Sequence, residues 1–226
     1  MSPLHWYVWR RLRTLSRAYP NKVRVLDIGG RKSHCTAGIL AQVTVIDLPP
    51  KTEIQRTLHL GIDSSTARKI KTRRTNIEHF VLGDMQHPPF QKALFDIVVS
   101  VEVLEHVEQD MLFIRQIHRV LKPGGVFLMT TPNGDYVVNR NLDHKRHYTL
   151  QHLMSILGSS FSKFEVEYAI RSGWFRRKGL SSWSVKHPMQ TILSMGGNFF
   201  NLVESSRARL AEQPFYTHHL IATAWK

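Results

Sequence analysis

Short apolar runs rich in β-branched residues alternate with helical patterns along the first part of the chain. They lie at residues 23–29, 42–47, 76–84, 95–103 and 126–131. The runs are almost continuously apolar, which is typical of strands buried on both faces of a parallel sheet. Between the last two, the apolar residues of 109–121 recur at helical spacing. This pattern predicts a helix that the sequence Lys122-Pro-Gly-Gly125 ends.

The second half of the chain continues this alternation and then departs from it. Residues 150–157 predict another helix, with Thr149 placed to cap its first turn. Two more strand patterns, 161–170 and 218–225, are separated by a stretch too long for a structureless connection in a compact domain. We therefore expect a helical insertion or cap over residues 172–217.

Composition agrees with one folded α/β domain. The chain has 226 residues, 42% of them hydrophobic, and no linker divides it, so we expect a single domain over residues 1–226 that begins with a helix over 1–20. No apolar run is long enough for a membrane span, and the arginine-rich start lacks the features of a secretory signal. The single cysteine, Cys35, excludes a disulfide framework within the chain and favours a reducing, cytoplasmic compartment.

Positive charge is in excess and unevenly distributed. The 31 Lys and Arg against 17 Asp and Glu give a formal net charge of +14. Residues 1–24 and 68–74 are strongly basic, whereas residues 84–110 are acidic. Basic flanks of this kind suit an anionic partner, which leaves nucleic acid, an anionic membrane surface and an anionic substrate open.

Polar residues follow the ends of the predicted strands, where ligands bind in open α/β sheets. The turn Gly29-Gly30 follows the first strand, which carries Asp27, and Asp47 ends the second strand, placed to accept hydrogen bonds from ribose hydroxyls. Asp84, after the third strand, is placed to accept a hydrogen bond from an exocyclic amine. A plain tight turn, a surface aspartate and a turn cap explain the same residues equally well, and no complete G-x-G-x-x-G motif is present.

The fourth predicted strand leads into a short acidic segment. Glu102 and His106 leave the strand at its carboxyl edge, where a ligand would bind. Glu105, between them, is expected to be a solvated residue at a helix start, where the helix dipole favours a carboxylate.

Taken together, these segments resemble the class I S-adenosylmethionine-dependent methyltransferases, and most closely their small-molecule, ubiquinone-biosynthesis-like branch (methyltransferase type 11). The resemblance covers residues 23–170 and rests on VLDIGG (25–30), VTVIDL (43–48), GDMQHPPF (83–90), FDIVVSVEVLEHV (95–107), RVLKPGGVFLMTTPN (119–133) and DHKRHYT (143–149). It implies a Rossmann-like sheet of seven strands, mostly parallel with an antiparallel last strand, and helices on both faces.

The resemblance also implies S-adenosyl-L-methionine as the cofactor and assigns residues to it. These are Asp27, Gly29 and Gly30 at the methionine part, Asp47 at the ribose, Asp84 and Met85 at the adenine, Glu102 near the reacting end, and Leu48 and Val101 as further contacts. The chain departs from the family at Arg31 and Ser33, where the glycine-rich turn usually has small residues.

Residues 143–149 concentrate titratable groups just after the fifth predicted strand. Methyl transfer to oxygen needs a deprotonated nucleophile, and a histidine with a pKa near neutrality is a suitable base. His144 and His147 are the leading candidates, which the sequence does not rank, and Glu102 and His106 are further catalytic candidates. An ordinary polar loop that caps the next helix is the alternative.

Two further interpretations concern this loop. Arg146 is expected to pair with an acidic group of the substrate or with Asp143. A divalent metal held by Glu102, His106 and this loop is conceivable, but the spacing carries no metal-ligand signature, so no metal is predicted.

Two segments pair apolar residues with basic ones. Residues 1–18 fit a helix at a membrane surface or, as the favoured interpretation, a helix whose apolar stripe covers the sheet. The apolar residues of 192–203 in the insertion are interpreted as a lid packed on the domain rather than a membrane anchor.

The predicted function is methylation of a small molecule that is acidic, sugar-linked or lipid-linked, with oxygen as the favoured acceptor. An RNA methyltransferase is the first alternative because of the net charge, although no RNA-binding module is recognisable. A non-catalytic, cofactor-binding accessory protein is the second. The sequence leaves the oligomeric state open.

Overall fold

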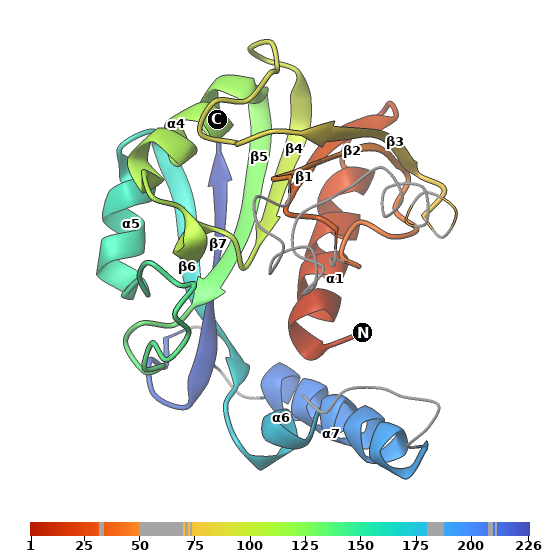
Figure 1. Cartoon of the computed structure of the whole chain (residues 1–226), viewed down its shortest axis with the longest axis vertical. Helices are drawn as coiled ribbons and strands as arrows, with labels where there is room; N and C mark the ends of the chain where they lie inside the picture. Colours follow the sequence, from red (N-terminus) through yellow and green to blue (C-terminus); the bar gives the residue numbers. More distant parts are fainter. Residues whose placement is uncertain are drawn as a thin grey trace.

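A seven-stranded sheet with the order β3-β2-β1-β4-β5-β7-β6 forms the centre of the molecule (Figure 1). The computed structural model describes residues 1–31, 34–49, 70, 72, 74–179, 188–207, 210 and 212–226. Its strands are β1 (Val23–Ile28), β2 (Ala41–Asp47), β3 (Ile77–Leu82), β4 (Phe95–Val101), β5 (Leu121–Pro132), β6 (Lys163–Arg171) and β7 (Thr217–Trp225). Only β7 runs antiparallel to its neighbours, which confirms the predicted fold.

All seven predicted strands are present, and the largest difference lies at the start of β5. This strand begins at Leu121, which pairs with Phe95 before the register shifts and Val126 pairs with Ile97. The intervening glycine turn bulges out of the ladder. A Cβ on Gly125 would lie 3.0 Å from the Asp96 carbonyl oxygen, so the bulge leaves no room for a side chain.

Helices cover both faces of the sheet. On one face lie α4 (Asp110–Val120) and α5 (Leu150–Gly158), and on the other lies α1 (Pro3–Arg17) (Figure 1). Ser2 caps α1, and the predicted cap Thr149 accepts a hydrogen bond from the His152 backbone N–H at the start of α5 (3.2 Å). Val8 and Leu12 of α1 are fully buried in the core. The apolar stripe of residues 1–18 therefore covers the sheet, as the favoured interpretation predicted.

The insertion between β6 and β7 is helical, as predicted, and consists of α6 (Trp174–Gly179) and α7 (Pro188–Arg207) in its described part. Both helices lie beyond the carboxyl ends of β4 and β5, beside the N-terminal end of α1 (Figure 1). The expectation of a lid with its apolar residues packed inward is wrong, because Ile192, Leu193 and Phe199 are exposed. None of the described helices is long and apolar enough to cross a membrane.

Candidate functional site

A glycine turn leads out of β1 at the carboxyl edge of the sheet. Gly29 has a φ of 66°, and a Cβ there would lie 2.8 Å from the Val103 side chain. A Cβ on Gly30 would overlap the Asp27 carboxylate at 2.3 Å. Position 29 thus requires glycine for its conformation and for space, and position 30 requires it for space, so the backbone stays accessible to a ligand.

The side chain of Asp27, in β1, helps to hold this turn in place. Its fully buried carboxylate accepts hydrogen bonds through Oδ2 from Thr36 Oγ1 (2.7 Å) and from the Arg74 guanidinium (3.0 Å), and Arg74 also donates to the Gly30 carbonyl oxygen (2.8 Å). Burial raises the pKa of the Asp27 carboxyl, although Arg74 and Thr36 oppose this shift. Asp27 Oδ1 has no hydrogen-bond partner within the described part of the chain, which leaves one acceptor facing the turn.

The basic cluster at residues 68–74 is only partly described. Arg68, Lys69, Lys71 and Arg73 lie outside the described residues, as do Lys32 and Ser33 of the glycine turn. Arg74 is 6% exposed and holds Asp27 in an ion pair, so this member of the cluster supports the turn rather than meeting a partner in solvent.

The two other predicted cofactor carboxylates lie on the same edge. Asp47 ends β2 and accepts a hydrogen bond from the Leu48 backbone N–H (2.8 Å), with Leu48 itself exposed. Asp84 follows β3, and both of its oxygens accept hydrogen bonds from the side chain of Gln86 (3.2 and 3.0 Å). Met85 is buried in the core and presents no exposed side chain at this edge.

Glu102 comes directly after Val101, the half-buried last residue of β4, and has a left-handed backbone conformation with a φ of 54°. Its carboxylate accepts a hydrogen bond from Thr130 Oγ1 (3.0 Å) and lies 3.3 Å from His219 Nδ1. Burial acts to raise the pKa of Glu102, but His219 and Thr130 outweigh it and the pKa is lowered. Glu102 is therefore ionised at neutral pH.

Glu105 is fully buried, so the expectation of a solvated residue is wrong. It lies in a single 3₁₀ turn (Leu104–His106), and its carbonyl oxygen accepts hydrogen bonds from the backbone of Lys145 and Arg146, so that the loop covers it. Thr131 Oγ1 donates to Glu105 Oε2 (3.1 Å), while Oε1 has no partner among the described residues. Burial, and then the nearby Glu102, raise the pKa of Glu105 well above its ordinary value.

The predicted histidines come together in a chain of defined hydrogen bonds. His147 Nδ1 lies 2.9 Å from the Val137 carbonyl oxygen, and its Nε2 lies 2.8 Å from His144 Nδ1. A carbonyl oxygen only accepts, so His147 is protonated on Nδ1 and its Nε2 accepts from His144. Neutral His144 is thereby left with an unprotonated Nε2. Burial, and then His106 and His147, lower the pKa of His144, which favours this neutral form.

His106 lies next to the His144–His147 pair. Its ring lies edge-on to that of His144 with centroids 4.6 Å apart, and its Nδ1 lies 3.0 Å from the Asp143 carbonyl oxygen. Arg146 does not pair with Asp143, which was one of the two partners expected from the sequence, and pairing with an acidic group of the substrate stays a prediction. Arg146 instead pairs with Asp110 and donates to the Glu108 carbonyl oxygen (3.0 Å), which ties the loop to the start of α4.

Glu105, His106 and His144 form the one group in the described part of the chain that has the composition and spacing of a metal site. Their candidate ligand atoms lie within 4.8 Å of one another. Imidazole nitrogens with one carboxylate oxygen suit a divalent transition metal. The sequence missed this grouping because Glu105 was assigned to solvent. That no metal is bound stays a prediction.

Two functional candidates were not found from the sequence at all. His218 and His219 begin β7, and because β7 is antiparallel its first residues lie at the edge where β4 and β5 end. Burial lowers the pKa of His218 to about 3, so it is neutral. Arg176 of α6 faces the same region, and burial lowers its pKa to about 10 against the opposing effect of Glu102. The antiparallel last strand was the signal that could have placed the histidines here.

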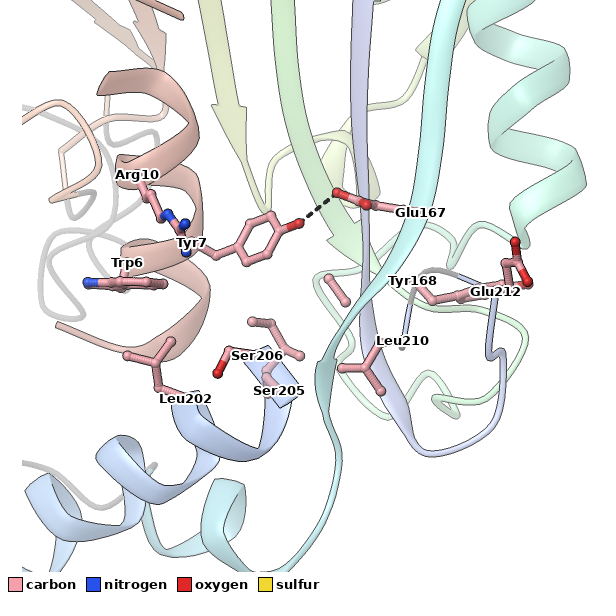
Figure 2. Close-up of a pocket in the computed structure, with 12 residues that line it drawn as sticks. Trp6, Tyr7, Arg10, Glu167, Tyr168, Leu202, Ser205, Ser206, Leu210 and Glu212 are labelled. Atoms are coloured by element: carbon pink, nitrogen blue, oxygen red, sulfur yellow. Dashed lines mark hydrogen bonds between the residues drawn. The ribbon is translucent and has the colours of Figure 1, made fainter. Parts of the chain in front are cut away.

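Two cavities share a wall near this region, and the smaller one reaches it through His219 and Arg176. The smaller, of about 130 Å³, is lined by His219, Arg176, Ile170 and the first turn of α1. The larger, of about 440 Å³, lies between α1, β6 and α7 (Figure 2). Ile170 lines both cavities. Tyr7 extends from α1 and donates a hydrogen bond to Glu167 of β6 (2.8 Å), which closes one side of it (Figure 2). Their lining is mixed, with aromatic, aliphatic and charged groups.

Comparisons with known proteins agree with this geometry. Residues 26–129 match the family described as "Methyltransferase domain". A probable S-adenosylmethionine-dependent methyltransferase of Mycolicibacterium smegmatis is 32% identical over 59% of this chain and 52% of its own length. A ubiquinone biosynthesis O-methyltransferase of Xanthomonas oryzae is 37% identical over 49% of this chain and 43% of its own length. The matches therefore span about half the length of these curated relatives.

A solved methyltransferase structure has a similar fold. The crystal structure of an S-adenosylmethionine-dependent methyltransferase from Archaeoglobus fulgidus superimposes with a TM-score of 0.61 at 16% identity, covering 98% of this chain and 94% of that one. At this identity the likeness shows the fold alone. The resemblance predicted from the sequence is confirmed, because residues 26–129 match the model of the methyltransferase domain family.

Proposed function

We propose that this protein is an S-adenosyl-L-methionine-dependent methyltransferase acting on the oxygen of a small, amphiphilic acceptor with an acidic group. The observation that carries the proposal is the hydrogen-bonded pair His144–His147, which leaves an unprotonated imidazole nitrogen on His144, next to Glu105 and His106. A neutral imidazole can take the proton of an acceptor hydroxyl as the methyl group arrives.

The cofactor would lie along the ends of β1, β2, β3 and β4. Gly29 and Gly30 would allow the methionine part to approach the backbone, Asp47 would bind the ribose hydroxyls, and Asp84 would accept a hydrogen bond from the adenine amine. S-Adenosyl-L-methionine supplies a methyl group on a sulfonium, which departs as a neutral thioether after in-line displacement. The chain's own contribution is alignment of the two reactants and removal of one proton.

The acceptor would occupy the two cavities that meet at Ile170. Arg176 remains protonated at neutral pH and supplies a cation for an acidic group, while Trp6 and Leu202 line the larger cavity for an apolar part (Figure 2). The relative named as a ubiquinone biosynthesis O-methyltransferase supports oxygen as the accepting atom. Burial of Arg74 removes one cation from the charge that prompted the RNA alternative.

Calorimetric titration with S-adenosyl-L-methionine and with NAD tests the cofactor. We expect binding of the first only, and Asp47→Ala should weaken it by about 1.5–3 kcal/mol, the range for a hydrogen bond to a charged group. Glu165→Ala, which removes a carboxylate that is 66% exposed on β6, is the control. Preference for NAD would refute the proposal.

The acceptor is tested with radiolabelled methyl donor and a panel of phenols and hydroxy acids, each with and without an aliphatic tail, beside structured RNA. Transfer to tailed acidic hydroxyl compounds is expected. Transfer to RNA alone would replace this function by the RNA alternative, and donor binding without any transfer would favour the accessory protein.

A further inference from the structure

Helix α7 presents its apolar side chains to solvent. The exposed ones are spaced three, four and seven residues apart and so lie on one face of the helix: Met189, Ile192, Leu193, Phe199 and Phe200, with exposures of 53–76%. Met195 is 52% exposed beside them, and Trp174 of α6 is 59% exposed. We call these seven residues the α7 apolar face. Contiguous exposed patches of this kind on a folded protein mark an interaction site.

The opposite side of α7, which packs on the protein, is polar and small. Ser194 and Asn198 donate hydrogen bonds to the Gly179 carbonyl oxygen (2.9 and 3.1 Å), and Asn201 donates to the Arg171 carbonyl oxygen (2.8 Å). A Cβ on Gly197 would lie 2.8 Å from the Gly179 nitrogen, so α6 and α7 approach closely. This is the reverse of an ordinary surface helix, which buries its apolar side. The apolar face is thus left for a partner outside the chain.

The α7 apolar face continues onto the N-terminal turn of α1. Met1 and Trp6 line one groove of about 230 Å³ together with Met195, Phe199 and Leu202. Figure 1 places α7 beyond the carboxyl edge of the sheet and next to the N-terminus. The surface is therefore formed by two elements that are far apart in the sequence.

The charges around this surface are positive. Arg177 and Lys178 of α6 and Arg10 of α1 are exposed, and α1 contains no acidic residue in its 15 positions. The acidic residue of α7, Glu204, is engaged by Arg171 (3.2 Å). An apolar face rimmed by cations fits a partner that is apolar inside and anionic at its surface. A second copy of this chain fits poorly, because symmetric pairing would bring the same cations together.

We propose that the α7 apolar face docks onto the surface of an anionic lipid bilayer, with α7 lying in the interface and Arg177 and Lys178 at the headgroups. Lys178 already lies over the Trp174 ring at 5.6 Å, as a cationic side chain does when it reaches past an aromatic ring to the headgroups. The docking depends on the surface alone and not on the reaction proposed above.

Flotation of the full chain with vesicles tests the proposal. We compare phosphatidylcholine vesicles with vesicles that also contain phosphatidylglycerol, at low and high salt. Binding is expected to the anionic vesicles and to weaken with salt. Arg177→Gln with Lys178→Gln should weaken it about 30-fold, from about a tenfold loss for each 1.4 kcal/mol and about 1 kcal/mol for each cation near the surface. Ile192→Ser with Phe199→Ser should abolish it.

Leu40→Ser with Leu142→Ser is the matched control, because these leucines are 87% and 101% exposed and belong neither to the α7 apolar face nor to α1, so their loss should leave binding unchanged. Circular dichroism and calorimetry with the methyl donor check that every variant is folded. The proposal is overturned by absence of vesicle binding, by equal binding of the Ile192/Phe199 variant, or by an oligomer in sedimentation that this variant converts to monomer without any lipid binding.

Discussion

The hydrogen bonds of the histidine pair predict unequal roles for two residues that the sequence could not rank. His144→Ala removes the proposed base, which should lower kcat by about 10²–10⁴-fold. His147→Leu removes only the acceptor of the His144 Nδ1–H, at 2.8 Å, and should lower kcat by about 2- to 12-fold, from about 0.5–1.5 kcal/mol for one hydrogen bond. His147→Gln keeps an acceptor toward His144 and a donor toward Val137 and should stay close to the original rate.

The pH dependence of kcat distinguishes a positioning role of His147 from a purely structural one. The neutral form of His144 is active, so activity rises with pH as the base loses its proton. Burial, His106 and His147 lower its pKa, so the midpoint of the acid limb should lie below 6.5. His147→Leu removes one of the neighbours that lowers this pKa, and the midpoint should move to higher pH. His147→Gln also removes the ring but keeps an acceptor for the His144 Nδ1–H, so the tautomer of His144 should be kept.

Nuclear magnetic resonance titration of the histidine rings reports the same pKa without an acceptor and identifies the protonated nitrogen. Calorimetry with the methyl donor should give unchanged affinity for all three variants, because none touches the glycine turn. The reasoning fails if His144→Ala turns over normally, or if His147→Leu loses as much as His144→Ala with no shift of the acid limb.

Three further predictions follow from buried groups. Arg74→Met leaves the Asp27 carboxylate buried without its cation and should lower the free energy of unfolding by about 3–5 kcal/mol in urea titration, whereas Lys22→Met, at an exposed pair with Glu78, should change it by less than about 1 kcal/mol. Glu105→Gln should stabilise the protein at pH 7 but not near pH 4, since the raised folded-state pKa of Glu105 makes its ionisation oppose folding as the pH rises above the ordinary value of 4.5; equal stability of the two proteins across this range would contradict the assignment. Removal of divalent ions with a chelator should leave methyl transfer unchanged if His144 acts as the base, and loss of activity that an added divalent ion restores would make Glu105, His106 and His144 ligands instead.

The fold could be predicted because each strand and helix is marked by residues close to it in the sequence. Each strand is a run of β-branched residues ended by a turn, and α4 has a complete apolar stripe before Lys122-Pro-Gly-Gly125. The start of β5 was placed late because the bulge at Gly125 hides the pairing of Leu121 with Phe95. That pairing depends on a partner 26 positions away and carries no local pattern.

The site residues could be predicted where they directly follow the end of a strand. They were harder to predict where burial by distant residues decides their environment and protonation. Asp47, Asp84 and Glu102 lie where the strand ends placed them. Glu105 was assigned to solvent because its neighbours on the chain read as a helix start, yet the backbone of the distant loop at Lys145 covers it. His219 was missed because a histidine inside a strand pattern carries no local signal of which edge it reaches.

The net charge of +14 shows why a total cannot identify a partner. Three arginines that count equally in the sum do different things in the structure. Arg74 is buried and holds Asp27 beneath the glycine turn, Arg176 faces Glu102 from a cavity wall, and Arg177, its neighbour in the chain, is exposed beside the α7 apolar face. Only the last kind is accessible to an extended anionic surface. Since Arg177 and Lys178 lie at the rim of a face made of apolar side chains, the same charge that first suggested RNA argues, once placed, for an interface with lipid.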